Sequence, residues 1–367
     1  MTSLERVLAA LSFRRGDRVP RFINFWPEFA DTWRAAGSGR ENADICRHYG
    51  SDIRVVVADE TAWPTTARIL EESSAEVVRR TGWGVIERVI AGGHFSQCLQ
   101  TSVPQRVDPA TLIFDDPRLD SRYDGAVRAA EGFQAEGLAV FCKTGGPYLR
   151  AAHMRGQEAF LTDLAEDPAW AQAMIDRVVD HITQVGVESL RRCGLEVPMI
   201  GIYDDVCDSR GPVMGPGRYQ RMFLPALRRM VQAYRRAGAV KVLHHCDGDV
   251  RGLLDMWVDA GIDAVHPLEA RLGIDPVQVR ATYDGRLAIV GALDNSRILP
   301  RGDREEIRRH VLHVLSAGRD GGLIVSPHSI GPDVSLKTMD YVAELLDAHG
   351  AYPLDLPGEF TSGPARS

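Results

Sequence analysis

The 367-residue sequence contains no apolar run approaching the roughly 18 residues that a membrane-spanning helix needs. A small-residue cleavage site is also missing from the opening stretch MTSLERVLAALSFRRGDRVP, which surrounds a short apolar segment with charges and is expected to be an amphipathic helix rather than a signal peptide. An excess of basic residues is missing too: 43 Lys and Arg stand against 50 Asp and Glu, a net charge of −7. Nucleic-acid partners select basic surfaces, so we expect a cytoplasmic protein without nucleic-acid or membrane partners.

Cysteine is scarce and never paired in the sequence. Six cysteines occur singly, without a C-x-x-C pair, and in a chain of this length they indicate reduced thiols rather than a disulfide framework. They are Cys46, Cys98, Cys142, Cys193, Cys207 and Cys246. Apolar residues, by contrast, are plentiful at 44%, with 25% charged, which excludes a disordered chain and is typical of a globular protein.

A glycine-rich phosphate turn is absent where a doubly wound sheet would carry one, because the first strand-like run leads into FWPEFADTW (25–33). What the chain does offer is eight strand-like runs, most of them followed by a helical pattern. This alternation predicts an α/β fold of the (β/α)₈ TIM-barrel type. The runs are 18–26, 52–59, 138–145, 197–205, 240–247, 263–269, 286–294 and 322–329.

The predicted barrel carries one extra segment. Residues 61–137 are too long for a single connecting helix, and within them VVRRTGWGVIERVIAGGHFSQCLQ (77–100) alternates apolar and polar residues. We therefore expect a β-hairpin or small sheet inserted between strands 2 and 3 of a single barrel domain covering residues 1–355. The end of the chain, 356–367, has no periodicity and is predicted to be a flexible tail.

Polar residues stand at the carboxyl end of every predicted strand, which is the edge where the active sites of such barrels lie. Any one of them could cap a helix or solvate a loop, but the complete set favours an active site. The strand ends are Asn24, Asp59-Glu60, Lys143, Asp204-Asp205, His245-Cys246-Asp247, Glu269, Asp294-Asn295 and His328.

The fifth strand is the most informative of these. Side chains alternate along a strand, so His245 and Asp247 share one face, about 7 Å apart, while His244 and Cys246 share the other, more apolar face. Imidazole and carboxylate in the barrel mouth could bind one divalent ion such as Zn²⁺, with a third ligand from the eighth strand. The candidate third ligand is His328 and a possible fourth is Glu269. The opposite register would offer His244 and Cys246, and without a metal the same residues could bind a substrate carboxylate or hydroxyl.

Two adjacent carboxylates end the fourth strand. Adjacent strand residues face opposite sides, so one of Asp204 and Asp205 is expected in the pocket as a general acid or base, and the other at a loop. A solvated turn is the alternative for this segment. Lys143, which precedes Gly145-Gly146, is expected to be a pocket charge rather than part of a phosphate loop, and Trp26 could line the mouth.

Three longer motifs stand out in the second half of the chain: LHHCDGDVRGLLDMWVDAGIDAVHPLE (243–269), VGALDNSRILPRG (290–302) and GGLIVSPHSIGPDVSLKTM (321–339). Together they resemble the uroporphyrinogen decarboxylase superfamily, which includes porphyrinogen decarboxylases and zinc-dependent, corrinoid-linked methyltransferases. The resemblance covers nearly the whole chain and implies the (β/α)₈ barrel, and it suggests a homodimer.

The sequence departs from both branches of that superfamily. The decarboxylases look to place arginine and tyrosine just before a P-E-F sequence, where this chain has Asn24 and Phe25 before WPEF (26–29). A substrate with many carboxylates would then be poorly neutralised. The methyltransferases look to use His-x-Cys on strand five and Cys on strand eight, where this chain has His245, Asp247 and His328. This harder ligand set suits an oxygen substrate or a water ligand better than a thiol.

These patterns lead to a predicted function: metal-dependent methyl transfer, or demethylation, on a small polar or aromatic substrate, with a corrinoid protein as partner. His245, Asp247 and His328 would hold the metal, most simply zinc, with Cys246 and Glu269 as further candidates. Asp204 or Asp205 would handle a proton beside His245 and His328. The predicted substrate-binding residues are Asn24, Trp26, Glu60, Lys143, Glu269 and Asp294. The alternatives are a metal-free decarboxylase that uses both histidines as hydrogen-bond donors, and a non-catalytic tetrapyrrole- or corrinoid-binding protein.

Overall fold

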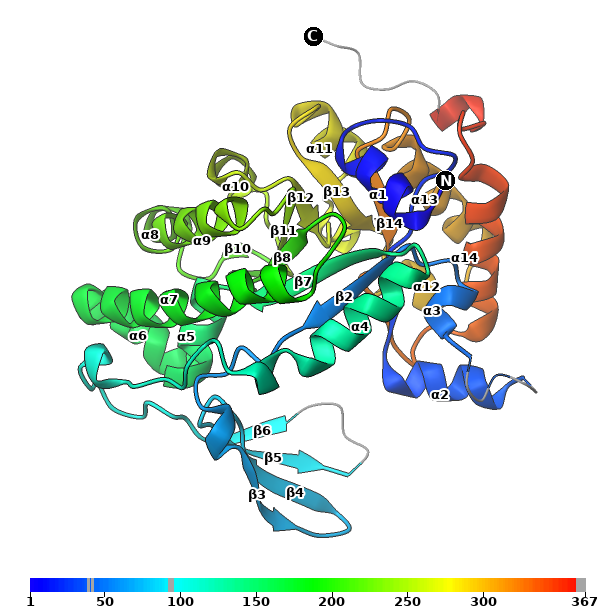
Figure 1. Cartoon of the computed structure of the whole chain (residues 1–367). Coiled ribbons are helices and arrows are strands. Elements are labelled where there is room, and N and C mark those ends of the chain that lie inside the picture. Colours follow the sequence, from blue (N-terminus) through cyan, green and yellow to red (C-terminus); the bar gives the residue numbers. More distant parts are fainter. Residues whose placement is uncertain (38–39, 41–42, 92–95, 361–367) are drawn as a thin grey trace.

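A computed structural model describes residues 1–37, 40, 43–91 and 96–360 and confirms the predicted barrel. Seven parallel strands form a curled sheet in the order β2–β7–β8–β11–β12–β13–β14 (Figure 1). Each lies within one of the predicted runs. The strands are β2 (Ile53–Val57), β7 (Ala139–Gly145), β8 (Met199–Tyr203), β11 (Lys241–His245), β12 (Ala264–His266), β13 (Ala288–Ala292) and β14 (Leu323–Ser326).

The eighth predicted run closes the barrel between the two ends of this sheet. The Val325 N–H donates to Pro20 O, and the Phe22 N–H donates back to Val325 O, each at 2.9 Å. On the other side the Asp52 N–H donates to Arg21 O at 2.8 Å. The run ends in the short strand β1 (Asn24–Phe25), which pairs in parallel with β15 (Ser329–Ile330).

The helices that cover the sheet begin and end where the local sequence requires. Helix α7 starts behind Asp167, whose carboxylate accepts the Trp170 N–H, with Pro168 in the first helical position. The helical segment between Pro216 and Arg236 is divided at Phe223, because Pro225 has no N–H to continue the ladder. The outer helices are α2 (Pro27–Ala35), α3 (Ile45–His48), α4 (Asp124–Ala135), α5 (Pro147–Arg155), α6 (Gln157–Glu166), α7 (Pro168–Arg192), α8 (Pro216–Met222), α9 (Leu224–Arg236), α10 (Leu254–Ala260), α11 (Pro276–Thr282), α12 (Ile298–Arg301), α13 (Arg304–Ser316) and α14 (Leu336–His349). None of the helices in the described part of the chain combines the length and the apolar composition of a membrane span.

The barrel interior is filled from one end by apolar side chains. The predicted amphipathic N-terminal helix, α1 (Ser3–Leu11), contributes Val7 and Leu11 to a buried cluster that also contains Phe141 and Leu243 from the strands. A second and larger core lies between the sheet and the outer helices. Because the interior is packed at the α1 end, the carboxyl ends of the strands are left to form the site.

The predicted insertion forms a four-stranded antiparallel sheet beside the barrel, in the order β3–β4–β5–β6 (Figure 1). Its strands are β3 (Arg68–Glu72), β4 (Glu76–Arg80), β5 (Ile86–Ile90) and β6 (Ser96–Gln100). At the other end of the chain, Gly358–Phe360 forms a short 3₁₀ turn, and residues 361–367 of the predicted tail lie outside the described residues.

Asp52 is the ionic centre of the barrel closure, with a side chain that is 1% exposed. Its carboxylate accepts hydrogen bonds from the Arg6 guanidinium at 2.6 Å and from Arg18 at 2.9 Å. It also accepts from the Ser3 hydroxyl at 2.7 Å and from the Arg21 backbone N–H at 2.8 Å. One buried carboxylate thus ties α1 and the closing run to the start of β2.

Replacing Asp52 with Ala is expected to lower the free energy of unfolding by about 3 kcal/mol or more, because Arg6 and Arg18 lose a buried counter-charge. Urea denaturation followed by circular dichroism measures the change. Asp31→Ala, which removes an exposed ion pair with Arg34, is the control and should cost less than about 1 kcal/mol. Equal losses in the two variants would contradict this assignment.

Candidate active site at the carboxyl end of the barrel

Strand β11 adopts the predicted register. Leu243 belongs to the interior cluster, and His245 follows it into the mouth of the barrel. His244 faces outward and stacks on Trp257 of α10, with ring centroids 4.1 Å apart. Cys246 is fully buried against Cys207 on the same outer side. The opposite register, with His244 and Cys246 as ligands, is therefore not the one adopted, and Cys246 lies away from the mouth.

His245, Asp247 and His328 converge at the strand ends, as the sequence predicts. Each offers one ligand atom, and the three atoms lie within 4.8 Å of one another. Asp247 Oδ1 is 3.8 Å from His245 Nε2 and 3.7 Å from His328 Nε2. This oxygen is buried and has no hydrogen-bond donor among the described residues. The three residues are called the metal trio below.

A third histidine, which the sequence analysis did not single out, lies behind the trio. His266 ends β12 directly beside His245, and their Nδ1 atoms are 2.7 Å apart. One proton must lie between these two nitrogens, so the bond directs His245 Nε2 toward Asp247. Burial lowers the pKa of both His245 and His266 well below the usual range, and His328 nearby lowers it further, which keeps both rings neutral.

His328 has a backbone conformation that few residues other than glycine adopt, with φ at +63°. Its N–H donates to Ser326 Oγ at 3.1 Å, which helps to hold the turn between β14 and β15. A left-handed histidine costs conformational energy, and such strain is concentrated at functional sites in proteins.

The two carboxylates that end β8 have different surroundings. Asp204 is fully buried and accepts the backbone N–H groups of Tyr148 at 3.2 Å and Leu149 at 2.6 Å, at the start of α5. Its burial raises the pKa of Asp204 to about 7. Asp205 has a side chain that is 39% exposed, and its Oδ1 lies 3.7 Å from His245 Nε2 and accepts the Asp247 N–H. Of the two predicted catalytic carboxylates, Asp205 faces the mouth and Asp204 caps a helix.

Lys143 stands at the mouth next to the trio. Its ammonium lies 4.1 Å above the ring centroid of Tyr203, which in turn stacks on His245 at 4.4 Å. Burial and the nearby Arg150 guanidinium lower the pKa of Lys143. The structure thus places Lys143, expected from the sequence as a pocket charge, beside Tyr203 and His245.

The carboxylate of Glu60 is occupied by hydrogen bonds to other protein groups and does not face the mouth freely. Its carboxylate accepts from Arg150 Nε and from the Gly145 N–H, both at 2.7 Å. The peptide that follows is held by His181 of α7, whose Nε2 lies 3.2 Å from the carbonyl oxygens of both Glu60 and Thr61. Burial lowers the pKa of His181 to about 4.

The remaining predicted substrate-binding residues mainly hold loops. Asp294 accepts the N–H groups of Ser296 and Arg297. Glu269 accepts from Arg271 and from the Gly248 N–H, and together with Asp294 and His328 it lines a depression of about 20 Å³. The Trp26 indole donates to Ser329 Oγ at 3.1 Å, and Asn24 pairs with Ser329 through the backbone.

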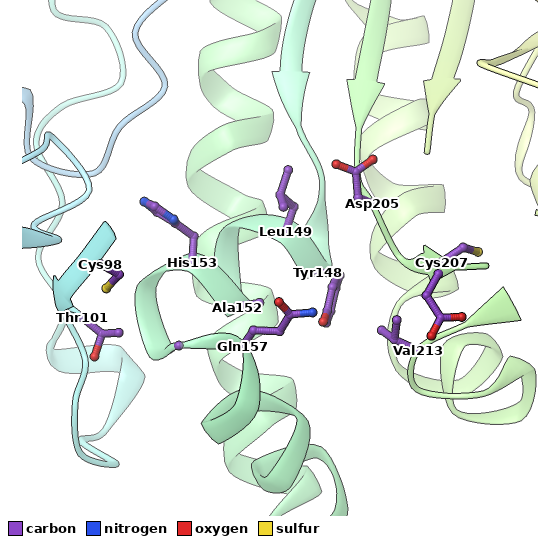
Figure 2. Close-up of a pocket in the computed structure, with 12 residues that line it drawn as sticks. Cys98, Thr101, Tyr148, Leu149, Ala152, His153, Gln157, Asp205, Cys207 and Val213 are labelled. Atoms are coloured by element: carbon purple, nitrogen blue, oxygen red, sulfur yellow. The ribbon is translucent and has the colours of Figure 1, made fainter. Parts of the chain in front are cut away.

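A much larger cavity, of about 420 Å³, opens beside Asp205. Figure 2 shows its walls: α5 in the centre, β6 of the insertion on one side and, on the other, the hairpin formed by β9 (Cys207–Asp208) and β10 (Gly211–Pro212). The lining residues are Cys98, Thr101, Tyr148, Leu149, Ala152, His153, Gly156, Gln157, Asp205, Cys207, Asp208 and Val213. Sequence patterns did not reveal this cavity, because its walls come from three separate parts of the chain.

Comparison with known proteins identifies a matching family, two relatives in sequence and a solved structure of similar fold. Residues 104–349 match the family described as uroporphyrinogen decarboxylase (URO-D). The uroporphyrinogen decarboxylase of Myxococcus xanthus is 23% identical over 94% of this chain and 97% of that protein. The corresponding protein of Syntrophotalea carbinolica is 29% identical, over about half of each: 52% of this chain and 54% of its own length. Among solved structures, a methyltransferase from Methanosarcina mazei is similar in fold, with a TM-score of 0.69 and 14% identity over 95% of this chain and 99% of its own.

The buried His181 makes stability depend on pH. Its pKa of about 4 is lower than the usual 6.5, so between these values the unfolded chain binds a proton that the folded chain does not. Stability is therefore lost as the pH falls through that window. His181→Gln keeps an N–H donor for the two carbonyls and removes the titration. Between about pH 7 and pH 4 the free energy of unfolding should therefore fall less in this variant than in the parent protein. The difference between the two losses should reach up to about 3 kcal/mol. Urea titrations across this range test it, and parallel curves for the two proteins would contradict it.

Proposed function

The chain belongs to the uroporphyrinogen decarboxylase (URO-D) family, and we propose that within this family it transfers a methyl group from a small polar or aromatic substrate with the help of a divalent metal ion. One observation carries the proposal: His245, Asp247 and His328 bring their ligand atoms within 4.8 Å of one another at the carboxyl ends of the barrel strands. This is where barrel enzymes place their chemistry.

The metal trio fits a cation better than it fits a hydrogen-bonded cluster. Its nitrogen-to-oxygen distances of 3.7–3.8 Å are too long for hydrogen bonds. Ligands of a tetrahedral Zn²⁺ lie about 3.4 Å apart, which differs from these separations by only a few tenths of an ångström. The orphaned, buried Asp247 Oδ1 adds a physical reason, because a carboxylate oxygen without a donor is costly unless a cation satisfies it.

His266 has the role of a supporting residue. Metal-binding histidines usually engage their second nitrogen with a partner that fixes the ring orientation and the tautomer. Here the 2.7 Å contact with His266 does this for His245 and leaves Nε2 directed at the carboxylates. When bound, the metal ion would act as a Lewis acid on an oxygen of the substrate.

The proton in the proposed reaction is assigned to Asp205. Both oxygens of Asp204 are bound to backbone N–H groups in the interior, whereas Asp205 is partly exposed and close to His245. In this reaction the bond between the methyl group and the substrate oxygen breaks, and its electron pair stays on the oxygen, which takes a proton from solvent by way of Asp205. The methyl group needs an acceptor that brings its own electron pair, and a reduced corrinoid with cobalt(I) would supply this chemistry. A separate corrinoid protein is our proposed partner.

The charges around the mouth support a substrate of low negative charge. Asn24 and Phe25 stand where the resemblance to porphyrinogen decarboxylases expects arginine and tyrosine, and Arg150 is already paired with Glu60. Lys143 is the cation next to the trio, and Asp205 and Asp247 are the acidic groups there. A substrate with many carboxylates would find few unpaired protein cations there, because Arg271, the arginine near Asp247, is paired with Glu269 as well.

Decarboxylation of a carboxylic acid is the second candidate. The family relation to uroporphyrinogen decarboxylases over nearly the full chain favours it, and Lys143 could pair with one substrate carboxylate beside His245 and His328. In this case the histidines would donate hydrogen bonds and no metal ion would be needed.

Metal binding tests the trio directly. We expect the purified protein, incubated with Zn²⁺ and dialysed, to retain about one ion per chain by elemental analysis. His245→Ala, Asp247→Ala and His328→Ala should each lose most of it, because three ligands are the minimum that proteins use for such sites. His313→Ala, a histidine on α13 paired with Asp275 outside the site, is the matched control and should retain the ion. Retention by all three trio variants, or no binding by the parent, would overturn the metal assignment.

Product analysis separates the two candidate reactions. With a methyl ether and free cob(I)alamin, methyl transfer should produce the absorption spectrum of methylcobalamin, and Asp205→Asn should slow it by about 100-fold or more because the proton donor is lost. Release of CO₂ from carboxylic acids without a metal ion, together with no methylation, would instead favour decarboxylation. Unchanged methylation by Asp205→Asn would remove that residue from its proposed role.

A further inference from the structure

The 420 Å³ cavity beside Asp205 has the size of a binding site for a substituted ring. An apolar cavity of about 150 Å³ is enough to hold one benzene molecule, so this one has room for a ring with substituents, but less than the roughly 600 Å³ that four such rings would take. Asp205 belongs both to the cavity wall and to the surroundings of His245. A ligand in the cavity would therefore reach the metal trio past this carboxylate.

The lining of the cavity discriminates against negative charge. Leu149, Ala152 and Val213 give it apolar surface, while Asp205 and Asp208 give it carboxylates. No lysine or arginine is among its described lining residues. A ligand carboxylate would lose its water there without gaining a cation, which is unfavourable.

Tyr148 provides a buried hydroxyl whose polar neighbour in the protein, Gln157, leaves it able to bind a ligand. The residue is 2% exposed, and its buried hydroxyl has no partner of normal hydrogen-bond geometry among the described residues. Gln157 is its polar neighbour in the cavity wall (Figure 2). A buried hydroxyl without a partner is unfavourable in the free protein, and a ligand oxygen in the cavity would satisfy it.

We propose that this cavity is a specificity subsite for the uncharged ring of the substrate, in which the Tyr148 hydroxyl binds a ring oxygen substituent and the absence of a cation rejects carboxylate-bearing rings. This inference rests on the proposed function for the direction of the ligand toward the trio. The binding of the ring itself depends only on the cavity.

Calorimetric titration with two related probes tests the subsite. The full-length protein should bind 2-methoxyphenol at least about tenfold more tightly than 4-hydroxy-3-methoxybenzoate, which adds a carboxylate to the same ring. Tyr148→Phe should weaken binding of 2-methoxyphenol by about fivefold, the value of one hydrogen bond, with little change in the thermal unfolding temperature, since the hydroxyl makes no hydrogen bond of normal geometry within the described part of the protein.

Val213→Phe provides a second variant from another wall, where the larger ring fills part of the cavity and should weaken binding by about tenfold or more. Val240→Phe, at a position 49% exposed outside the cavity, is the matched control and should bind like the parent. Equal affinity for both probes, or parent-like binding by both Tyr148→Phe and Val213→Phe, would overturn the subsite.

Two further results distinguish failure of the subsite from failure of the proposed function. If the protein binds 2-methoxyphenol with the expected variant effects but never retains a metal ion, the subsite stands and metal-assisted methyl transfer falls. If it retains the metal ion through the trio but does not bind 2-methoxyphenol, the subsite falls and the metal assignment stands.

Discussion

The ring of strands closes at residues 20–25, and the geometry of the site depends on this closure. The closing run makes few backbone hydrogen bonds to its neighbours, and the buried carboxylate of Asp52 gathers α1, the closing run and β2 around one charge. The same run ends in β1, which pairs with β15 next to His328. The position of the third residue of the metal trio is therefore linked to the closure, through β15 and β1, as well as to the strand β14 that precedes it.

Burial assigns different roles to chemically identical groups around this site. Asp204 and Asp205 are neighbours in sequence, yet one is enclosed at a helix start while the other faces the mouth. His244 and His245 divide in the same way, one stacked on Trp257 and the other directed at Asp247. In both pairs the alternation of side chains along a strand makes the division.

This alternation is also why much of the site could be predicted from the sequence. The eight strand runs, the inward face of β11 and the convergence of His245, Asp247 and His328 follow from local patterns together with the geometry of a barrel. The contact between His266 and His245 does not, because it depends on the register between β11 and β12, which packing fixes and no local pattern encodes. The hydrogen bonds of Glu60 and Asp294 could not be predicted for a related reason. Their partners, Arg150 and the Ser296 N–H, are brought to them by the folded conformation of the chain around the strand ends.

The sheet inserted after β2 contributes Thr101 and Cys98 to a wall of the cavity, whereas the metal trio stands on β11, β14 and the residues that follow them. The two parts of the site thus belong to segments of chain that fold against each other without sharing a strand. Changes of length or composition in the insertion can reshape the wall while the residues that would hold the metal keep their places. Relatives with the same barrel and a different insertion would then differ more in the substrates that they accept than in the reaction that they carry out.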